Sequence, residues 1–449
     1  MTGPMTDSRL LRLCESTQPI AHKLEPAQKT EIEAAVAAWL LENPGKDRPL
    51  SFNGTHGELI AARQYAGIIG TREVTVEIYP KLDAALLMET PTIDLKETNS
   101  TLRNLLWMME VAAGSEAAES GTAGLEQEPT NFFEILAFLL ARNLKRELEL
   151  GLPHEYVRHE DDLRMVRGRL NLLPQITMNW NRWDRLRCAW DEFTPDNPIP
   201  RLFKCACKFL HSRVEHSEVA RLLENCLGFL DEVGSVNPCS ALAGVHGLRW
   251  DRRFDRFRRS FDLAQRLLLG TGHALMTGDA DTFVFLVDMH QLFQDYTHVL
   301  LEELFGVSVE QQVKVGSLFR RSPGGMNQLA DYRWKMASQA PWIGDAKYKH
   351  LGKQGQPIDE IEEADIRQLT VYAELERLRA GHEASPSLMI LFPFVGVAQE
   401  FQTCRKTAWN GSDFWLVPVE VKQKDSLLAC LPENVGSLGQ DAACATANS

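Results

Sequence analysis

Two acids and a lysine in the C-terminal third of the sequence have spacing that suits metal-assisted hydrolysis. Asp331 lies in the segment LADYRWK, and Asp345 and Lys347 lie in the later segment WIGDAKYK. Both segments have the pattern of short strands, and residues i and i+2 of a strand point to the same face. The Asp345 carboxylate and the Lys347 ammonium group are therefore predicted to project together, while Ala346 points into the core.

This grouping suits the hydrolysis of a phosphodiester. Asp331 and Asp345 are predicted to hold one or two Mg²⁺ ions, because Mg²⁺ is a hard cation that prefers oxygen ligands, and the backbone carbonyl of Ala346 is a third predicted ligand. Mn²⁺ is an expected substitute, because carboxylate, carbonyl and water ligands suit it as well. A bound metal polarises the phosphoryl group and lowers the pKa of a coordinated water. Lys347 is predicted to position that water or to stabilise the developing negative charge.

A helix predicted over residues 361–379 follows the two strands. Gln368 and Tyr372 are four residues apart and therefore share one helix face, from which they can contact phosphate oxygens or hold the lysine. Gln294, on an earlier predicted helix, is a further candidate polar group. An Asp-x-Lys pair on a strand is often only an exposed ion pair. The apolar Trp342 and Ile343 ahead of this one favour a central strand, where a buried charge needs a reason.

A second group of residues has the same acid, acid-x-lysine pattern. Asp413 precedes the apolar run 414–417, and Glu420 and Lys422 follow it. No predicted helix comes after this run, and a polar tail begins soon after it. We therefore interpret it as a peripheral strand without a catalytic role.

Two arginine-rich segments are candidate contacts for nucleic acid. Residues 249–259 interleave arginines with aromatic residues, a combination that can follow a nucleic-acid backbone. Asp251 and Asp255 lie at helical spacing to those arginines and offer ion pairs instead. The second segment, Arg164 to Arg169, contains Gly168 and is interpreted either as a surface turn or as a contact with phosphate or a partner.

Composition limits the class of protein. The chain of 449 residues is long enough for two or three domains at roughly 100–200 residues each, and its net charge is −13. An acidic chain that cuts DNA needs a local basic groove or a partner that delivers the substrate. The nine cysteines are scattered without zinc-site spacing, which favours reduced thiols in a cytoplasmic protein. The most apolar stretch, residues 132–140, is too short to span a membrane, and no GxxxxGK[ST] loop is present, so no nucleotide is expected on this chain.

Periodicity predicts a multi-domain α/β chain. Residues 27–42 have helical spacing, and Val74, Val76 and Ile78 alternate with polar residues as in a strand. Helical patterns dominate residues 130–272, and a further long helix is predicted from Thr282 onward. The predicted division is a β-rich domain over 1–113, a helical middle domain over 114–280 that opens with a linker, an α/β domain over 281–425 and a flexible tail over 426–449.

The motifs resemble those of the McrC family, the nuclease subunits of McrBC-type modification-dependent restriction systems. The Asp331 strand, the strand 343–348 and the helix segment 368–372 are similar to that family's PD-(D/E)xK core. Further segments that agree are 166–170, 190–202, 289–296, 62–67 and 78–81. The chain departs from the family pattern at Gln294, where many members have Glu, and at Ala330, which stands in place of Pro.

The resemblance implies a restriction-endonuclease-like core over 281–425 and a Mg²⁺-dependent endonuclease that acts in antiviral defence. It also implies a partner, an AAA+ GTPase hexamer like McrB that recognises modified cytosine in double-stranded DNA and whose GTPase the chain stimulates. Residues 1–113 are the expected partner-binding domain. Two alternatives remain: a non-catalytic adaptor that activates the motor, and a stand-alone PD-(D/E)xK repair nuclease that cuts without a GTPase.

Overall fold

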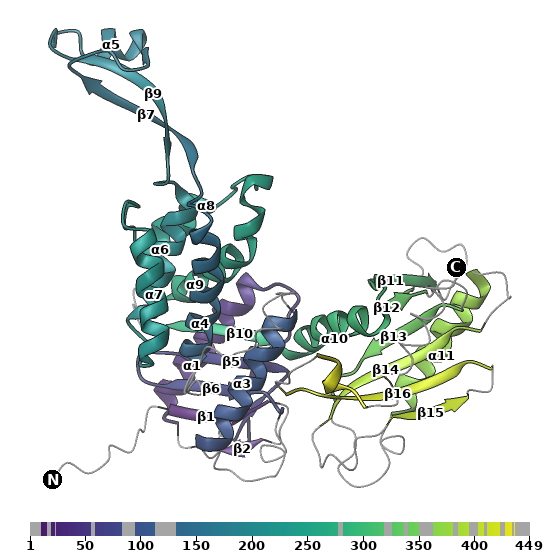
Figure 1. Ribbon diagram of the computed structural model, residues 1–449. Coiled ribbons are helices and arrows are strands. Elements are labelled where there is room, and N and C mark those ends of the chain that lie inside the picture. The colour runs from purple at the N-terminus through teal and green to yellow at the C-terminus, as the bar shows by residue number, and fades with distance from the viewer. Residues whose placement is uncertain are drawn as a thin grey trace. The chain divides into compact units, whose positions relative to one another are not determined.

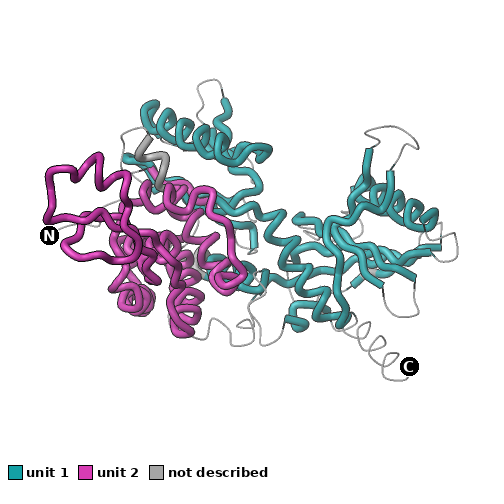
Figure 2. The backbone as a smooth tube through the Cα atoms, turned by 90° about the horizontal axis from the view of Figure 1, so that it is seen from above, with its two compact units in different colours: residues 1–131, 286–449 teal, residues 132–285 magenta. Residues whose placement is uncertain are grey.

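A computed structural model describes most of the chain and divides it into two compact units (Figure 2). The described residues are 10–15, 19–22, 24–54, 59–82, 95–112, 132–276, 282–317, 326–335, 340–349, 362–379, 385–394, 403–407, 411–422, 427–432 and 435. Unit 1 comprises residues 1–131 and 286–449, and unit 2 comprises residues 132–285. The predicted domain division stays a prediction, and unit 2 overlaps the range 114–280 expected for the helical middle domain. The linker predicted at its start lies outside the described residues.

The N-terminal part of unit 1 is rich in strands, as its alternating sequence predicts. One sheet has the order β1-β6-β5-β10 and a second has the order β2-β4-β3. The strands are β1 (Leu10–Cys14), β2 (Ile20–Ala21), β3 (Leu50–Asn53), β4 (Leu59–Ala62), β5 (Tyr65–Gly70), β6 (Thr75–Tyr79) and β10 (Phe283–Asp288), of which residues 286–288 belong to unit 1. The helices are α1 (Pro26–Glu42), at the predicted position, and α3 (Leu95–Ala112).

The helix predicted from Thr282 onward begins later than expected. Residues 283–288 form β10, and the helix α10 runs over Met289–Phe305. The Asp288 side chain accepts hydrogen bonds from the backbone N–H groups of His290 (3.2 Å) and Gln291 (3.4 Å) and so caps the helix at its start. The prediction was wrong because the apolar run FVFLV fits a helical pattern as well as a buried strand.

The C-terminal part of unit 1 is a six-stranded mixed sheet with the order β11-β12-β13-β14-β16-β15 (Figure 1). Its strands are β11 (Glu310–Ser317), β12 (Asn327–Trp334), β13 (Trp342–Ala346), β14 (Ser387–Phe394), β15 (Cys404–Thr407) and β16 (Asp413–Glu420). β13, β14 and β16 run parallel, and the remaining neighbours pair antiparallel. The helix α11 (Glu363–Arg379) supplies Leu369, Tyr372 and Ala373 to a core with Ile343 and Ile390 of the sheet.

The two faces of this sheet meet different helices. Arg333 bonds Glu376 of α11 at 2.9 Å, so one face of β12 lies against that helix. The next residue back, Tyr332, donates its hydroxyl to the Gln294 carbonyl of α10 at 2.6 Å, so the other face lies against α10. Trp342 of β13 also packs on α10, with its ring 5.6 Å from that of Phe305. β12 and β13 are therefore held from both sides.

Beyond β16 the chain packs further than predicted. A 3₁₀ helix, η5 (Leu427–Cys430), contributes buried Leu427 and Cys430, and Leu431 is also buried. The flexible tail predicted from residue 426 is therefore wrong for residues 427–431, because this segment is apolar throughout and buries three of its five side chains. Residues 436–449 lie outside the described residues.

Unit 2 is mainly helical. Its helices are α4 (Phe132–Glu149), α6 (Pro198–His211), α7 (Ser217–Phe229), α8 (Pro238–Val245), η2 (Arg252–Phe257) and α9 (Arg258–Met276). Gly151 follows α4 at a φ of 113°, and its N–H bonds the Leu148 carbonyl at 2.9 Å, so it ends the helix as its position predicts. Among the described residues, no helix of either unit is long and apolar enough to cross a membrane.

A three-stranded arm extends from this bundle (Figure 1). It consists of β7 (Glu155–Leu163), β8 (Arg169–Leu170), α5 (Leu172–Met178) and β9 (Leu186–Thr194), with α5 at the far end. The prediction that helical patterns dominate residues 130–272 did not include these strands. Every residue of β7 is at least partly exposed, so its sequence lacks the apolar alternation by which a strand is predicted.

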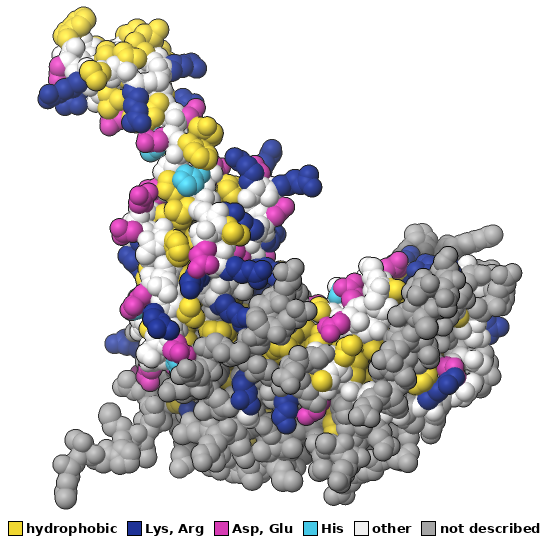
Figure 3. Space-filling model, viewed as in Figure 1, with side chains coloured by type: hydrophobic (Ala, Val, Ile, Leu, Met, Phe, Trp, Pro, Cys, Tyr) yellow, Lys and Arg dark blue, Asp and Glu magenta, His cyan; other side chains and the backbone are white. Residues whose placement is uncertain are grey.

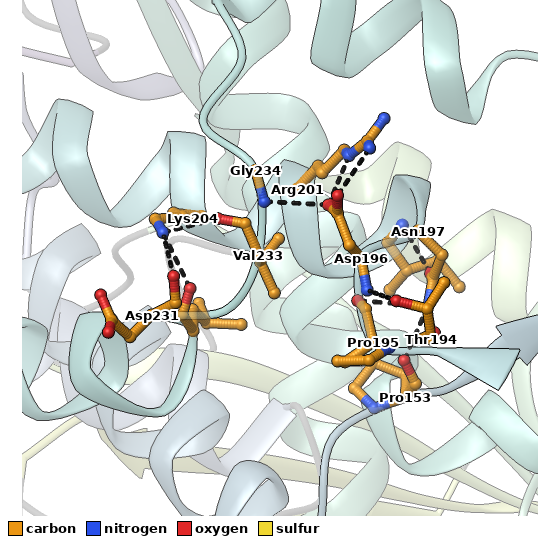
Figure 4. Close-up of polar contacts among 12 residues, drawn as sticks. Pro153, Thr194, Pro195, Asp196, Asn197, Arg201, Lys204, Asp231, Val233 and Gly234 are labelled. Atoms are coloured by element: carbon orange, nitrogen blue, oxygen red, sulfur yellow. Dashed lines mark hydrogen bonds and ion pairs between the residues drawn. The ribbon is translucent and has the colours of Figure 1, made fainter. Parts of the chain in front are cut away.

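Polar contacts surround the first turns of α6, where the arm joins the bundle (Figure 4). Asn197 donates to the Pro153 carbonyl at 2.7 Å, which joins the start of β7 to the start of α6. Asp196 accepts two bonds from Arg201, at 2.7 and 2.8 Å. Lys204 donates to the carbonyls of three residues just beyond α7: Leu230 (2.9 Å), Asp231 (3.2 Å) and Val233 (2.6 Å).

Candidate active site

Asp331 and Asp345 lie opposite each other where β12 and β13 separate. The antiparallel register pairs Tyr332 with Gly344, and its continuation places Asp331 beside Asp345. At this point the Asp331 carboxylate, in place of a backbone carbonyl, accepts the Ala346 N–H at 3.0 Å. Asp331 also accepts from the Gln312 side chain of β11 at 3.2 Å. The strand pair thus places two carboxylates beside each other at its end.

Lys347 connects this acid pair to α11. Its ammonium nitrogen lies 2.7 Å from Asp345 Oδ2, so the i, i+2 prediction of a shared face holds in the structure. The same nitrogen donates to Gln368 Oε1 at 3.1 Å and lies 3.6 Å from Asp365 Oδ1. Asp345 is 2% exposed, while the side chain of Lys347 remains 20% exposed. The lysine is therefore held between strand and helix with one side open to solvent.

Tyr372 takes part through Gln368. The Gln368 amide donates to the Tyr372 hydroxyl one turn along α11, which orients the amide so that its oxygen faces Lys347. Tyr372 itself is buried in the core between the helix and the sheet. The structure thus brings together all five side chains that the sequence singled out, with Tyr372 one contact removed from the lysine.

Burial and mutual repulsion shape the charges of the site. Burial, and next the nearby Asp345 charge, raise the pKa of Asp331 from its ordinary 3.8 to about 7. Burial, the largest single influence, would lower the pKa of Lys347, but the charge and hydrogen bond of Asp345 together with the charges of Asp365 and Asp331 outweigh burial and raise it, so the ammonium form is retained. A carboxylate whose ionisation is suppressed beside a second carboxylate, as that of Asp331 is, is suited to a cation that relieves the repulsion.

The donors fit a hard divalent ion. The described residues contain no cluster of three or more His, Cys, Asp or Glu side chains able to hold a metal. Asp331 and Asp345 would therefore need backbone and water oxygens to complete a coordination shell, which is the usual situation of Mg²⁺. The backbone N–H and C=O of a strand residue point to the same side. The Ala346 N–H points at Asp331, so its carbonyl also lies on the Asp331 side.

Two charged residues of the site were missed by the sequence interpretation. Asp365, at the start of α11, lies near Lys347 and accepts from Lys349 Nζ at 3.2 Å. Lys349 also lies 3.0 Å from Glu362. The sequence spacing could have indicated Asp365, because it precedes Gln368 by three residues and so lies on the same helix face.

The second acid, acid-x-lysine pattern does not form a site. Asp413 and Glu420 are the first and last residues of β16, which puts them roughly 23 Å apart at about 3.3 Å per residue. Asp413 is paired with Arg405 at 2.6 Å, and Glu420 lies 3.7 Å from Lys422. β16 is nevertheless internal to the sheet, between β14 and β15, and not the peripheral strand that was expected.

Several arginines of residues 249–259 support local structure in unit 2. Asp251 caps η2 and pairs with Arg253 at 2.9 Å, while Arg256 donates to the Gly151 carbonyl at 2.6 Å. Asp255 accepts from the Trp250 indole and not from an arginine. These contacts favour the ion-pair interpretation for part of this segment.

The second arginine segment contains the turn that its glycine predicts. Gly168 has a φ of 67°, and a Cβ added there would lie 2.5 Å from the Ala189 carbonyl oxygen of β9. Beside it, Arg167 stacks 4.6 Å from the Trp190 ring centroid and pairs with Glu192 at 3.3 Å. The segment is therefore a tight turn packed against β9. Gln294, the remaining candidate, accepts the Tyr332 hydroxyl through its backbone carbonyl.

Comparison with known proteins identifies the family of the chain. No curated protein matches the chain. Among solved structures, Thermococcus gammatolerans McrC bound to McrB AAA+ hexamers, from a tetradecameric assembly, is similar over 96% of this chain and 99% of that one, at 18% identity and a TM-score of 0.64. At this identity the match shows a shared fold. The structure of the Thermococcus gammatolerans McrBC complex also matches, over 66% of this chain and 88% of that one, at 19% identity and a TM-score of 0.44. Residues 60–393 of the 449 match the family model of the McrBC 5-methylcytosine restriction system component, and the chain therefore belongs to that family.

Proposed function

We propose that this chain is the Mg²⁺-dependent endodeoxyribonuclease subunit of a restriction complex that acts on DNA with modified cytosine. The observation that carries the proposal is the acid pair Asp331 and Asp345, with Lys347 held 2.7 Å from Asp345 and bonded to Gln368. A strand pair that presents two carboxylates and a lysine to one space has the groups that phosphodiester hydrolysis requires. Mixed α/β architecture and membership of the family support the same assignment.

Each residue of the site has a separate role in the proposed reaction. Asp331 and Asp345, with the Ala346 carbonyl, would hold the Mg²⁺, which when bound polarises the phosphate and lowers the pKa of a coordinated water. Lys347 keeps its charge beside Asp345 and can orient the attacking water or stabilise the charge that develops on the phosphate. Gln368 accepts from the ammonium group and limits its rotation, and Tyr372 holds Gln368 in turn.

The proposal includes an AAA+ GTPase hexamer as partner, which the chain binds and stimulates. The related Thermococcus gammatolerans McrC is bound to McrB AAA+ hexamers. A partner would also explain how an acidic chain, with a net charge of −13, reaches DNA. Its GTP hydrolysis would deliver DNA to the site, since no nucleotide-binding loop occurs in this sequence.

The far end of the arm is the surface we assign to this partner. Large apolar side chains are gathered there and exposed to solvent, with Trp183 at 93% (Figure 3). The others are Met165, Val166, Leu172, Leu173, Ile176, Met178 and Trp180. A contiguous exposed apolar patch of this kind marks an interaction site in a soluble protein. The N-terminal domain stays a predicted second contact.

The nuclease assignment is tested by cleavage of methylated DNA in the presence of Mg²⁺, GTP and the AAA+ protein. Asp345→Asn and Lys347→Ala should each reduce the cleavage rate by about 100-fold or more, since each removes charge that acts on the reacting phosphate. Glu420→Gln is the matched control, because it changes a similar Glu-x-Lys pair that lies outside the site, and it should cut at the wild-type rate. Cleavage by either site variant at the normal rate would exclude this active site.

The partner surface is tested separately by association with the AAA+ hexamer. Trp183→Ser should weaken binding and GTPase stimulation without lowering the melting temperature, because the side chain makes little contact within the chain. Leu41→Ser is the control, since Leu41 is also highly exposed, at 85%, but lies on α1 of the N-terminal domain. If Leu41→Ser alone disrupts the complex, the N-terminal domain and not the arm is the docking surface.

The same assays distinguish the two alternatives. A non-catalytic adaptor would stimulate GTP hydrolysis equally well as the wild type and as Lys347→Ala, with no cleavage in either. A stand-alone repair nuclease would cut DNA with Mg²⁺ in the absence of GTP and of the AAA+ protein.

A further inference from the structure

A buried carboxylate from the N-terminal segment contacts the strand that carries the catalytic lysine. The Tyr348 hydroxyl donates to Glu15 Oε1 at 2.5 Å, across 333 residues of sequence. Glu15 is 0% exposed and Tyr348 is 2% exposed. Both residues belong to unit 1. Tyr348 follows Lys347 directly, so the contact lies one residue from the reacting group.

The contact is built into a larger cluster. Glu15 Oε1 also accepts the backbone N–H of Lys81 at 3.1 Å, and the Lys81 ammonium group lies 4.8 Å from the centre of the Tyr348 ring. Phe293 and His290, on α10, each pack with their ring centroids 5.7 Å from that of Tyr348. The buried Glu15 carboxylate therefore contacts two separate motifs. One is the segment that ends at Lys81, and the other is the segment with Lys347 that follows β13.

The backbone around Lys347 needs such an anchor. β13 ends at Ala346, and the Lys347 N–H makes one further bond to the Leu391 carbonyl at 2.9 Å. Side chains of consecutive residues in extended chain point to opposite sides. With Tyr348 bound on the α10 side of the sheet, Lys347 is directed to the α11 side, toward Asp345.

We infer that Glu15 and Tyr348 are positioning residues, which hold the end of β13 so that Lys347 stays aligned with the acid pair. This inference rests on the proposed nuclease function, and neither residue touches the reacting atoms. It makes the N-terminal segment part of the nuclease machinery, because the carboxylate that fixes the catalytic strand comes from residue 15. The nuclease sheet would then work at full rate only with β1 in place.

The test compares the removal of two buried tyrosine hydroxyls, each of which donates to a glutamate. Tyr348→Phe removes the hydroxyl that bonds Glu15. Tyr79→Phe is the matched control, because the buried Tyr79 hydroxyl donates to Glu77 at 2.7 Å and not to Glu15, and its removal leaves the backbone bond from the Glu15 N–H to the Tyr79 carbonyl in place. Both variants should lose some thermal stability. Only Tyr348→Phe should reduce kcat, by about 10- to 100-fold with KM little changed, since a small misplacement of a catalytic group has an effect of this size.

Two further measurements separate positioning from a general loss of structure. Glu15→Gln keeps an acceptor oxygen and should retain most of the wild-type kcat, whereas Glu15→Ala should behave like Tyr348→Phe. Hydrogen exchange of the backbone amides of residues 347–349 should accelerate in Tyr348→Phe and not in Tyr79→Phe.

The possible outcomes are distinct for the two proposals. Wild-type complex that fails to cut DNA, or Lys347→Ala complex that cuts normally, would overturn the nuclease function and the inference with it. Wild-type complex that cuts, with equal kcat for Tyr348→Phe and Tyr79→Phe, would overturn the positioning role alone. Unchanged amide exchange in Tyr348→Phe would do the same, since the end of β13 would then be held without the contact.

Discussion

The substitution Asp331→Asn is expected to stabilise the metal-free protein while it removes activity. Asparagine has nearly the shape of aspartate, so its side-chain oxygen can still accept the Ala346 N–H, which lies 3.0 Å from the present carboxylate. Its amide nitrogen can donate to Asp345, which stands opposite. A repulsion between two carboxylates is thereby replaced by a hydrogen bond, and a metal ligand is lost.

The size of the effect follows from the pKa of Asp331. A rise from 3.8 to about 7 corresponds to about 4 kcal/mol of unfavourable free energy for the ionised form. An unfolded chain releases this proton near pH 3.8, but the folded chain keeps it to about pH 7. The folded state therefore loses stability relative to the unfolded state as pH rises through this window, and the whole cost is present above it. At pH 8, Asp331→Asn should recover up to about 4 kcal/mol, and below pH 3.8 it should recover none.

The assay is the melting temperature of wild-type and variant protein at pH 8 and at low pH, in EDTA and in Mg²⁺. In EDTA at pH 8 the variant should melt several degrees higher, at roughly 2 °C per kcal/mol for a chain of this size. Mg²⁺ should raise the melting temperature of the wild type, because a ligand that binds the folded state stabilises it, and should leave the variant unchanged. Asp413→Asn is the control, since its carboxylate pairs with Arg405 and should lose little. A variant that melts below wild type at pH 8 in EDTA would refute the repulsion between the two acids, and an equal response to Mg²⁺ would refute Asp331 as a ligand.

Three further changes probe the supports of the site and of the arm. Gln368→Ala should lower the single-turnover cleavage rate by about tenfold, because the Lys347 ammonium group loses an acceptor that limits its rotation. Lys204→Met should destabilise unit 2 by about 1–3 kcal/mol or more, since buried carbonyls beyond α7 lose their donor; proteolysis of residues 230–234 should accelerate. Gly168→Ala should weaken association with the AAA+ hexamer, because a Cβ there meets the Ala189 carbonyl at 2.5 Å and displaces the end of the arm; unchanged affinity would show that this turn does not shape the docking surface.

The candidate site could be found from the sequence because its geometry is local. Asp345 and Lys347 are two residues apart on one strand, and Gln368 and Tyr372 are one turn apart on one helix, so each pair follows from the period of its element. Asp331 needed the further step that β12 and β13 pair antiparallel. Two features could not be predicted from the periodicity of single elements. They are the strand register that places Asp331 opposite Asp345 and the hydrogen bond from the Ala346 N–H to Asp331.

Contacts between distant segments could not be predicted in this way. Glu15 lies 333 residues from Tyr348, and no periodicity links them. The arm was missed for a different reason. Hydrophobic patterns predict elements that bury a face within the chain, whereas the apolar residues of α5 are exposed and none of that helix is buried. Exposed apolar residues of this kind mark an interaction surface, and patterns that assume burial within the chain do not predict it.

The charges around Lys347 indicate the order in which the components of the site assemble. Asp331, Asp345, Asp365 and Glu362 face the two ammonium groups of Lys347 and Lys349. Above about pH 7, where Asp331 is ionised, the metal-free site therefore carries a formal excess of two negative charges. A phosphodiester brings one more negative charge and would be repelled, in a chain whose overall charge is already −13. One Mg²⁺ neutralises that excess, and a second would make the site attractive to the backbone of DNA. Binding of the scissile phosphate should therefore follow binding of the metal, and a protein in EDTA should hold DNA through its partner alone.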